Sequence, residues 1–409
     1  MSGGQPIFGE LFAAGRLPSF QIDYLCGMNT TIESIINDIP SPCFVLEEDK
    51  LRQNLQLIDS VQQAAGVQII LALKGFSMFS AFPIVREYLS GATASSLNEI
   101  KLVNEYMGIR AHAYIPAYRD DEFEEVLNRS SHVTFNSWSQ WERFGQRARE
   151  RGVSCGIRVN PQYSEVATDM YNPCVPGSRL GVTRDKLPDQ LPDGLEGIHF
   201  HTLCENDSYT LERTLEALES RFASLLHQAK WVNMGGGHLM TREGYNTEHL
   251  IGLLKAFREK YNVEVIMEPG SAIGWQTGVL TATVLDVFDS QGIDVAVLDT
   301  SFAAHMPDTL EMPYKPRIRG AYQEPVADKP TYRLGGMTCL AGDFMGDYSF
   351  DQPLQVGDTI IFEDMIHYTM VKTTTFNGVG LPAIGILKAD GTFALVRQYG
   401  YESFKDRLS

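Results

Sequence analysis

Short apolar runs alternate with amphipathic stretches between about residues 67 and 270 of the chain. Runs this apolar are typical of parallel strands that are covered on both faces. Most of the stretches between them repeat their apolar residues every three or four positions, as helices do. The eight runs occupy residues 67–74, 91–96, 111–116, 131–136, 153–160, 195–201, 230–237 and 263–270. Helical stretches occupy residues 50–66, 96–108, 120–130, 137–152, 207–229 and 247–261. Eight strand–helix repeats within about 200 residues predict a (β/α)8 TIM barrel.

The pattern changes after about residue 275, where short strands follow one another with turns and few helices between them. Such a pattern predicts a mostly antiparallel β domain. The expected strands occupy residues 281–290, 294–301, 331–342, 358–370 and 392–398. We therefore predict an N-terminal extension over residues 1–41 that partly joins the β domain, a barrel over residues 42–274, and a β domain over residues 275–409.

Composition narrows the class of protein. The 409 residues are 44% hydrophobic, which suits two globular domains. The net charge of −17 disfavours nucleic-acid and membrane partners and is compatible with a cationic small-molecule ligand. No apolar run reaches the roughly 18 residues of a membrane span, and the first residues lack a secretory pattern. The six cysteines show no CxxC spacing, which is typical of reduced thiols. We therefore expect a cytoplasmic protein.

Polar residues and glycines follow the predicted barrel strands at their carboxyl ends. Lys74 ends the first strand, His199 and His201 the sixth, residues 235–237 (three glycines) the seventh, and Glu268 the eighth. Catalytic groups of such barrels lie at this face. The convergence favours an active site over the simpler interpretations, which are a surface lysine, a tight turn and a structural ion pair.

Their combined chemistry suits one cofactor. A partly desolvated lysine amine can form an imine with an aldehyde, and glycines let backbone N–H groups approach a phosphate. A carboxylate can pair with a protonated ring nitrogen. Pyridoxal phosphate presents all three groups. The His199/His201 pair also raises a metal site as an alternative, but such sites in barrels need further histidine and aspartate ligands at other strand ends, and none is well placed, so we predict no metal.

Six segments resemble the fold-type III pyridoxal-phosphate decarboxylases, a family with an alanine-racemase-like barrel and a C-terminal β-barrel domain. The segments are LALKGFS, GIHFHTLCE, VNMGGGH, MPDTLEMPYKP, GGMTCLAGD and YTMVKTTTFNG. The resemblance extends from about residue 42 to about residue 398. The particular variants are similar to the branch that decarboxylates carboxynorspermidine and carboxyspermidine to norspermidine and spermidine, in polyamine biosynthesis. Alternatives are a decarboxylase of diaminopimelate, ornithine or arginine, and a catalytically inactive regulator with the same fold.

The resemblance implies roles for individual residues. Lys74 would hold the cofactor covalently and His201 would stack on its ring, so both count as catalytic candidates together with Cys339. Cys339 would come from the partner subunit of a homodimer with shared active sites and donate a proton. The remaining candidates bind the cofactor (Gly235, Gly236, Gly237, Glu268 and Tyr368) or the substrate (Asp299, Asp308, Glu311 and Asp343).

The sequence departs from the family pattern at three places. Ser271 replaces the arginine that usually follows the glutamate, so the phosphate is expected to depend more on the glycines and on Tyr368. Cys204 replaces the usual serine of the histidine motif, and Leu340 follows Cys339 where diaminopimelate decarboxylases carry an acid. The last departure weakens the diaminopimelate alternative. The two acids in MPDTLEMPYKP, Asp308 and Glu311, suit a longer polyamine tail.

Overall fold

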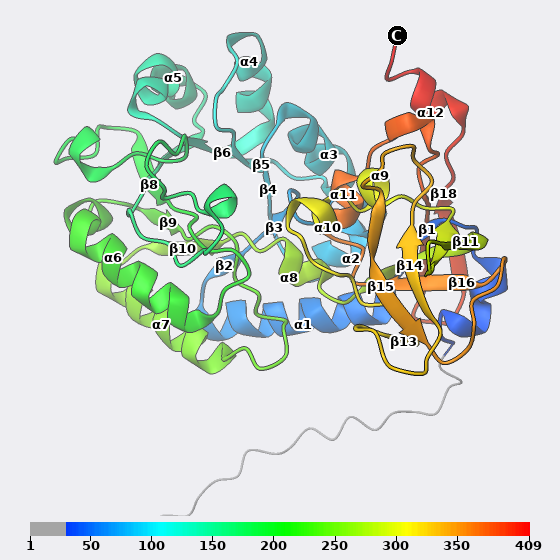
Figure 1. The fold of residues 1–409 in the computed structure, drawn as a ribbon. Helices are drawn as coiled ribbons and strands as arrows, with labels where there is room; N and C mark the ends of the chain where they lie inside the picture. Colours follow the sequence, from blue (N-terminus) through cyan, green and yellow to red (C-terminus); the bar gives the residue numbers. More distant parts are fainter. Residues whose placement is uncertain (1–29) are drawn as a thin grey trace, which may run out of the picture.

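The computed structural model describes residues 30–409, so the predicted N-terminal extension lies outside the described residues up to residue 29. None of the helices in this described part is long and apolar enough to cross a membrane. Two sheets organise the described chain, a parallel barrel on the left and a mixed sheet on the right of Figure 1.

The eight predicted barrel strands are all present. They are β2 (Gln68–Ile69) with β3 (Leu71–Ala72), β4 (Ala92–Ala94), β5 (Ala111–Tyr114), β6 (Ser130–Phe135), β7 (Ser154–Arg158), β8 (Leu195–His199), β9 (Trp231–Asn233) and β10 (Glu264–Met267). The first strand is divided at Ile70 into β2 and β3, and every pairing is parallel. β2 pairs with β10 and β3 pairs with β4, so the divided strand closes the barrel.

The six predicted helices surround the barrel. They are α1 (Glu48–Ala65), α3 (Leu97–Met107), α4 (Asp120–Arg129), α5 (Trp138–Glu150), α6 (Ser208–Leu226) and α7 (Thr247–Tyr261). Two short helices that were not predicted, α2 (Phe82–Arg86) and α8 (Ser271–Gly274), accompany them. Local signals set several boundaries. Ser96, Ser137 and Asp207 each accept a hydrogen bond from the backbone N–H three residues ahead. Gly66 and Gly108 end α1 and α3 in the left-handed conformation.

The second sheet is mostly antiparallel, as predicted. Its strands are β1 (Cys43–Glu47), β11 (Gly278–Ser290), β12 (Ile293–Leu298), β13 (Ala321–Tyr322), β14 (Thr331–Gly335), β15 (Phe344–Phe350), β16 (Thr359–Glu363), β17 (Ala383–Leu387) and β18 (Phe393–Arg397). The order is β13-β15-β14-β12-β11-β1-β17-β18, with β16 paired to β11. Only the β1–β17 and β12–β14 pairs are parallel among the described strands of this sheet.

Strand β1 belongs to this second sheet, whereas the sequence analysis assigned it to the barrel. β1 pairs with β11 and β17, and Cys43 and Val45 are buried beside Ile32 and Val279 in a separate small core. The chain then crosses to the barrel through α1, which runs between the two parts in Figure 1. An apolar strand carries no local signal for which of two sheets it will join, so the boundary at residue 42 placed it in the barrel.

Two predicted strands of the β domain are shorter than expected. β14 ends at Gly335, so residues 336–342 form a loop, and β16 ends at Glu363. The short helices α9 (Phe302–His305), α10 (Pro307–Glu311), α11 (Tyr368–Lys372) and α12 (Tyr401–Lys405) complete the domain. Helices α10 and α11 pack on α9 and on each other, and they carry predicted site residues toward the barrel.

Candidate active site

A cavity of about 1810 Å³ lies at the carboxyl ends of the barrel strands and reaches α10 and α11 of the β domain. It brings together many of the predicted site residues from both domains. Its lining includes Lys74, His199, His201, Gly236, Gly237, Glu268, Asp308 and Tyr368. It does not include Gly235, Asp299, Glu311, Cys339 or Asp343. The strand-end argument therefore located the barrel half of the site, whereas several residues predicted from the β domain lie elsewhere.

Lys74 follows β3 and extends its side chain into the cavity. The side chain is exposed to the cavity, yet protein surrounds that cavity on most sides. Desolvation, reinforced by the Arg158 guanidinium, therefore lowers the pKa of Lys74 below its ordinary value. A lowered pKa increases the neutral, nucleophilic fraction of the amine.

Glu268 is a buried carboxylate held by two donors at the cavity floor. Asn233 Nδ2 donates to Glu268 Oε1 at 2.7 Å, and His199 Nε2 lies 3.4 Å from Oε2. Burial by itself raises the pKa of Glu268, but these donors hold it below its ordinary value. Burial also lowers the pKa of His199, so we assign a neutral imidazole beside an ionised Glu268. The site thus contains a negative charge that is fixed in orientation.

The glycine turn after β9 is shaped by close backbone contacts. Gly237 has a φ of +86°, and a Cβ there would lie 2.1 Å from the Leu203 carbonyl oxygen. Gly235 donates its N–H to Asn233 Oδ1 at 2.9 Å, and Gly236 donates to His201 Nδ1 at 3.1 Å. Within residues 30–409 the Gly237 N–H has no protein acceptor. Of the three predicted phosphate-binding glycines, Gly237 is therefore the one whose N–H is available.

His201 is a neutral ring at the cavity wall. Burial and the nearby Lys74 charge lower its pKa well below the ordinary value. Its Nδ1 lies 3.1 Å from both the N–H and the carbonyl oxygen of Gly236, so it accepts from the former or donates to the latter according to the ring tautomer. In residues 30–409 no group of three or more His, Cys, Asp or Glu side chains is arranged to hold a metal ion.

Arg158 is a site residue that the sequence analysis did not identify. It ends β7, is 3% exposed, and lines the cavity. Its Nη2 donates to the His201 carbonyl at 2.9 Å, and its guanidinium lies 4.8 Å from the centre of the Tyr114 ring. No carboxylate of the described chain lies within ion-pair distance of it. The strand-end rule that selected Lys74 and Glu268 applies equally to β7 and would have found it.

Asp308 is the buried acid on the β-domain side of the cavity. Tyr314 donates its hydroxyl to Asp308 Oδ2 at 2.6 Å, and Thr369 donates to the same oxygen at 2.7 Å. The other oxygen, Oδ1, is buried and has no protein partner in the described chain. Glu311, predicted to act with Asp308, is instead exposed and paired with Lys372. One of the two acids is therefore placed to meet a ligand in this cavity.

Tyr368 begins α11 and also faces the cavity. Burial raises the pKa of Tyr368, so its phenol keeps its proton and remains a hydrogen-bond donor at neutral pH. Ser271, at the start of α8, lines the same cavity and lies close enough to act on the pKa of this phenol. Ser271, which replaces the arginine of the family pattern, is thus close to Tyr368, which is predicted to bind the phosphate.

Cys339 lies on the exposed loop over residues 336–342, outside the cavity of its own chain. Its backbone N–H donates to Asn377 Oδ1 at 2.8 Å. Asp343 anchors this loop: its carboxylate accepts hydrogen bonds from Ser301 Oγ, the Ala303 N–H, and both the N–H and Oγ1 of Thr338. With four protein donors and 5% exposure, Asp343 positions this loop within its own chain.

Asp299 also lies away from the cavity. Its Oδ1 accepts a hydrogen bond from the Thr283 N–H at 2.8 Å, between β11 and the end of β12. Burial raises its pKa. This placement gives Asp299 a contact inside the second sheet and no contact with the cavity of its own chain.

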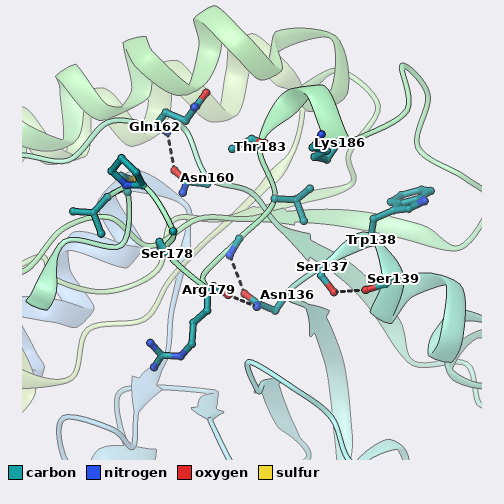
Figure 2. Close-up of a pocket in the computed structure, with 16 residues that line it drawn as sticks. Asn136, Ser137, Trp138, Ser139, Asn160, Gln162, Ser178, Arg179, Thr183 and Lys186 are labelled. Atoms are coloured by element: carbon teal, nitrogen blue, oxygen red, sulfur yellow. Dashed lines mark hydrogen bonds between the residues drawn. The ribbon is translucent and has the colours of Figure 1, made fainter. Parts of the chain in front are cut away.

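A second cavity of about 590 Å³ lies beside the first, between the ends of β6 and β7 and the loop over residues 174–183 (Figure 2). Asn136 fixes this loop, since its Nδ2 donates to the Arg179 carbonyl at 2.6 Å and its Oδ1 accepts the Gly181 N–H at 2.9 Å. The Arg179 side chain extends away from the other lining residues in Figure 2 and also lines the larger cavity. Residues of this loop therefore line both cavities. Lys74, His199, His201 and Glu268 line the larger cavity and not the smaller one.

A barrel-end lysine with a lowered pKa, a buried ionised acid and a glycine turn define a site of the pyridoxal-phosphate class on a barrel with an added β domain. The chain matches the family described as "Pyridoxal-dependent decarboxylase, C-terminal sheet domain" over residues 43–366. The protein belongs to this family of pyridoxal-dependent decarboxylases.

Individual relatives are similar over nearly the whole chain. Carboxyaminopropylagmatine decarboxylase of Synechocystis sp. is 52% identical, over 91% of this chain and 96% of its own. Carboxynorspermidine/carboxyspermidine decarboxylase of Campylobacter jejuni is 43% identical, over 90% and 98% respectively. The crystal structure of carboxynorspermidine decarboxylase from Campylobacter jejuni, complexed with norspermidine, superposes with a TM-score of 0.84 at 41% identity, covering 90% of this chain and 100% of that one.

Proposed function

We propose that this protein decarboxylates carboxynorspermidine and carboxyspermidine, giving norspermidine and spermidine, as a step of polyamine biosynthesis. The observation that carries the proposal is the buried, unpartnered Oδ1 of Asp308 in the same cavity as Lys74. A buried carboxylate oxygen is costly to leave unpaired, and an ammonium group of a ligand would satisfy it. The named activities of the Campylobacter jejuni relatives support the same substrate class.

The residues of the cavity fit pyridoxal phosphate as the cofactor. Lys74 supplies an amine for the aldehyde, Glu268 an ionised partner for the ring nitrogen, and His201 a flat neutral face for the ring. The Gly237 N–H, Ser271 and the Tyr368 hydroxyl are the donors for the phosphate. A Cβ at Gly237 would collide with the Leu203 carbonyl, so only glycine permits this turn and the position of its N–H. When bound, the cofactor supplies an electron-accepting ring for the electron pair left by departing carbon dioxide.

The remaining residues have roles in orientation and proton transfer. Lys74 would hold the cofactor through its side-chain amine and would yield that place to the substrate amine, because its lowered pKa keeps part of the amine in the neutral form that such a bond requires. Glu268 holds a proton on the ring nitrogen because Asn233 and His199 keep its carboxylate ionised and oriented. Asp308 holds the cationic tail. Cys339 gives its thiol proton to the carbon that has lost the carboxylate.

The proposed role of Cys339 requires a second copy of the chain. Cys339 is exposed and does not line the cavity of its own chain, while Met337 and Leu340 beside it are 46% and 48% exposed. Exposed apolar residues around a rigid loop are typical of a surface that a partner covers. We infer a homodimer in which the loop over residues 336–342 enters the cavity of the partner subunit.

A second candidate substrate is carboxyaminopropylagmatine, which is favoured by the 52% identity to the Synechocystis relative. Its tail ends in a guanidinium group where that of carboxyspermidine ends in an ammonium group. The cavity volume of about 1810 Å³ exceeds the range of about 300–1,000 Å³ that is usual for small-ligand sites, so the longer tail is not excluded by size.

Carbon dioxide release from the purified protein with added pyridoxal phosphate tests these assignments. Carboxynorspermidine, carboxyspermidine, carboxyaminopropylagmatine, diaminopimelate, ornithine and arginine are compared at equal concentration. If the proposed function is correct, carboxynorspermidine and carboxyspermidine give the highest kcat/KM. If the second candidate is correct, carboxyaminopropylagmatine gives it. Preference for diaminopimelate, ornithine or arginine would refute the proposed tail site. Cofactor binding without turnover of any substrate would favour the inactive regulator.

A further inference from the structure

We propose that His367 is the resident cation of the acidic end of the cavity, and that it releases its proton when a polyamine tail binds there. The inference rests on the proposed function, because it requires a polycationic ligand. It assigns His367 a role in the affinity and pH dependence of ligand binding.

The position of His367 sets it against carboxylates inside the cavity. It precedes α11, is 6% exposed, and lines the cavity. Its Nε2 lies 3.2 Å from Asp364 Oδ1, and neither ring nitrogen makes a well-aligned hydrogen bond in residues 30–409. The ring is therefore a buried polar group with a carboxylate oxygen beside it.

Three structural elements contribute acids to the cavity that His367 lines. Asp364 comes from the segment after β16, Glu205 from the loop after β8, and Asp308 from α10, and all three line the cavity. The uncharged rings of Trp275 and Tyr368 lie 6.1 Å and 6.2 Å away, centre to centre. Lys372, further along α11, is paired with Glu311. The charged groups that act on the pKa of His367 are thus acids.

Asp364 is held in its position by backbone conformation. Its φ is +64°, in the left-handed region that non-glycine residues seldom adopt, and its Oδ1 accepts the Gln276 N–H at 2.5 Å. Such conformations persist where the surroundings impose them, and they gather at functional sites. The acid beside His367 is therefore a fixed feature of the cavity.

The electrostatic consequence separates His367 from the other buried histidines. Burial alone would lower its pKa, but Asp364, Glu205 and Asp308 together raise it above the ordinary value. Burial lowers the pKa of His112 to about 3 and those of His238 and His305 to about 4. In the absence of a ligand, His367 is thus charged at a pH where those three are neutral.

A polyamine tail changes this balance. Its ammonium groups would occupy the same acidic region and would place like charges close together in a poorly solvated cavity. Loss of the His367 proton relieves this repulsion and leaves the carboxylates to the ligand. Ligand affinity should therefore rise with pH, by up to about tenfold per pH unit while His367 remains protonated in the free enzyme.

Isothermal titration calorimetry of the holoenzyme with norspermidine tests the inference. The titration is run at about pH 6.5, near the ordinary pKa of histidine, in two buffers of different ionisation enthalpy. A buffer-dependent binding enthalpy that reports proton release is expected for the wild-type protein. The release should disappear in His367→Gln, and in His367→Asn should the first variant not fold. His249→Gln is the matched control, because His249 lies 3.5 Å from Glu212 away from the cavity and its removal should leave the release unchanged.

The outcomes are distinguishable. Binding with the same enthalpy in both buffers, or equal proton release in His367→Gln, would overturn the inference and leave the proposed function intact. Absence of norspermidine binding at any pH would overturn both, because the inference presupposes a polyamine ligand. Proton release that is lost only with His367 supports it.

Discussion

Replacement of Asp308 by asparagine tests the tail site with little change in packing. Tyr314 and Thr369 both donate to Oδ2, so the amide oxygen of the introduced side chain is expected to take that position and keep both hydrogen bonds. The amide nitrogen then replaces Oδ1, the buried oxygen without a partner in the described chain. The substitution thereby presents a donor where the wild-type protein presents a negative acceptor, and the local structure is preserved.

The expected effect is a loss of substrate affinity with kcat largely retained. A hydrogen bond to a charged group contributes about 1.5–3 kcal/mol, so KM for carboxynorspermidine should rise about 10- to 150-fold. Steady-state carbon dioxide release measures KM and kcat, and thermal unfolding of Asp308→Asn verifies that the fold is intact. Glu311→Gln is the matched control, because Glu311 is exposed, paired with Lys372 and outside the cavity lining, and its KM should stay within about threefold of wild type. A KM for Asp308→Asn within about threefold of wild type, or an equal rise in Glu311→Gln, would refute the reasoning.

Three further predictions concern other parts of the site. Gly237→Ala should reduce the free energy of unfolding by about 2–4 kcal/mol in denaturant titrations, because its Cβ would meet the Leu203 carbonyl and φ is positive. The control is Gly252→Ala on α7, which has open space around it and should not lower the free energy of unfolding. Glu268→Gln should lower kcat about 100-fold or more, since the fixed negative charge is lost; a kcat within about tenfold of wild type would exclude the assigned role. The stability of the ligand-free enzyme should fall as pH rises through the raised pKa of His367, above about 6.5, because the folded state then loses its bound proton; an equal slope in His367→Gln would contradict this.

Much of the barrel and its half of the site could be predicted from local patterns. All eight apolar runs form barrel strands, and the strand-end rule selected Lys74, His201 and Glu268, which meet in one cavity. This succeeded because alternation with amphipathic helices implies parallel strands, and parallel strands bring their carboxyl ends to one face. Arg158 ends β7 in the same way, so the same rule accounts for its position although it was not predicted.

The β-domain side of the site was predicted less well. Asp299 and Asp343 were expected at the substrate, and neither lines the cavity of its own chain, whereas Cys339 was expected to act in the cavity of the partner subunit. Asp343 instead receives hydrogen bonds from Ser301, which is 42 residues away along the chain. The resemblance of short segments to the family identifies which acidic residues are present. The hydrogen-bond donors that their carboxylates meet depend on contacts between segments far apart in the sequence.

The sequence by itself determined the eight-stranded barrel, the mostly antiparallel second part and the glycine turn. Side chains return to the same face about every two residues in a strand and about every 3.6 residues in a helix, and glycine adopts backbone conformations closed to other residues. These properties act locally along the chain. Only the tertiary structure decided that β1 joins the second sheet, that one buried oxygen of Asp308 has no partner in the described chain, and that Asp364 lies against His367. These features arise where residues far apart in sequence compete for the same buried partners, and burial then sets the free-energy cost of every unpaired charge.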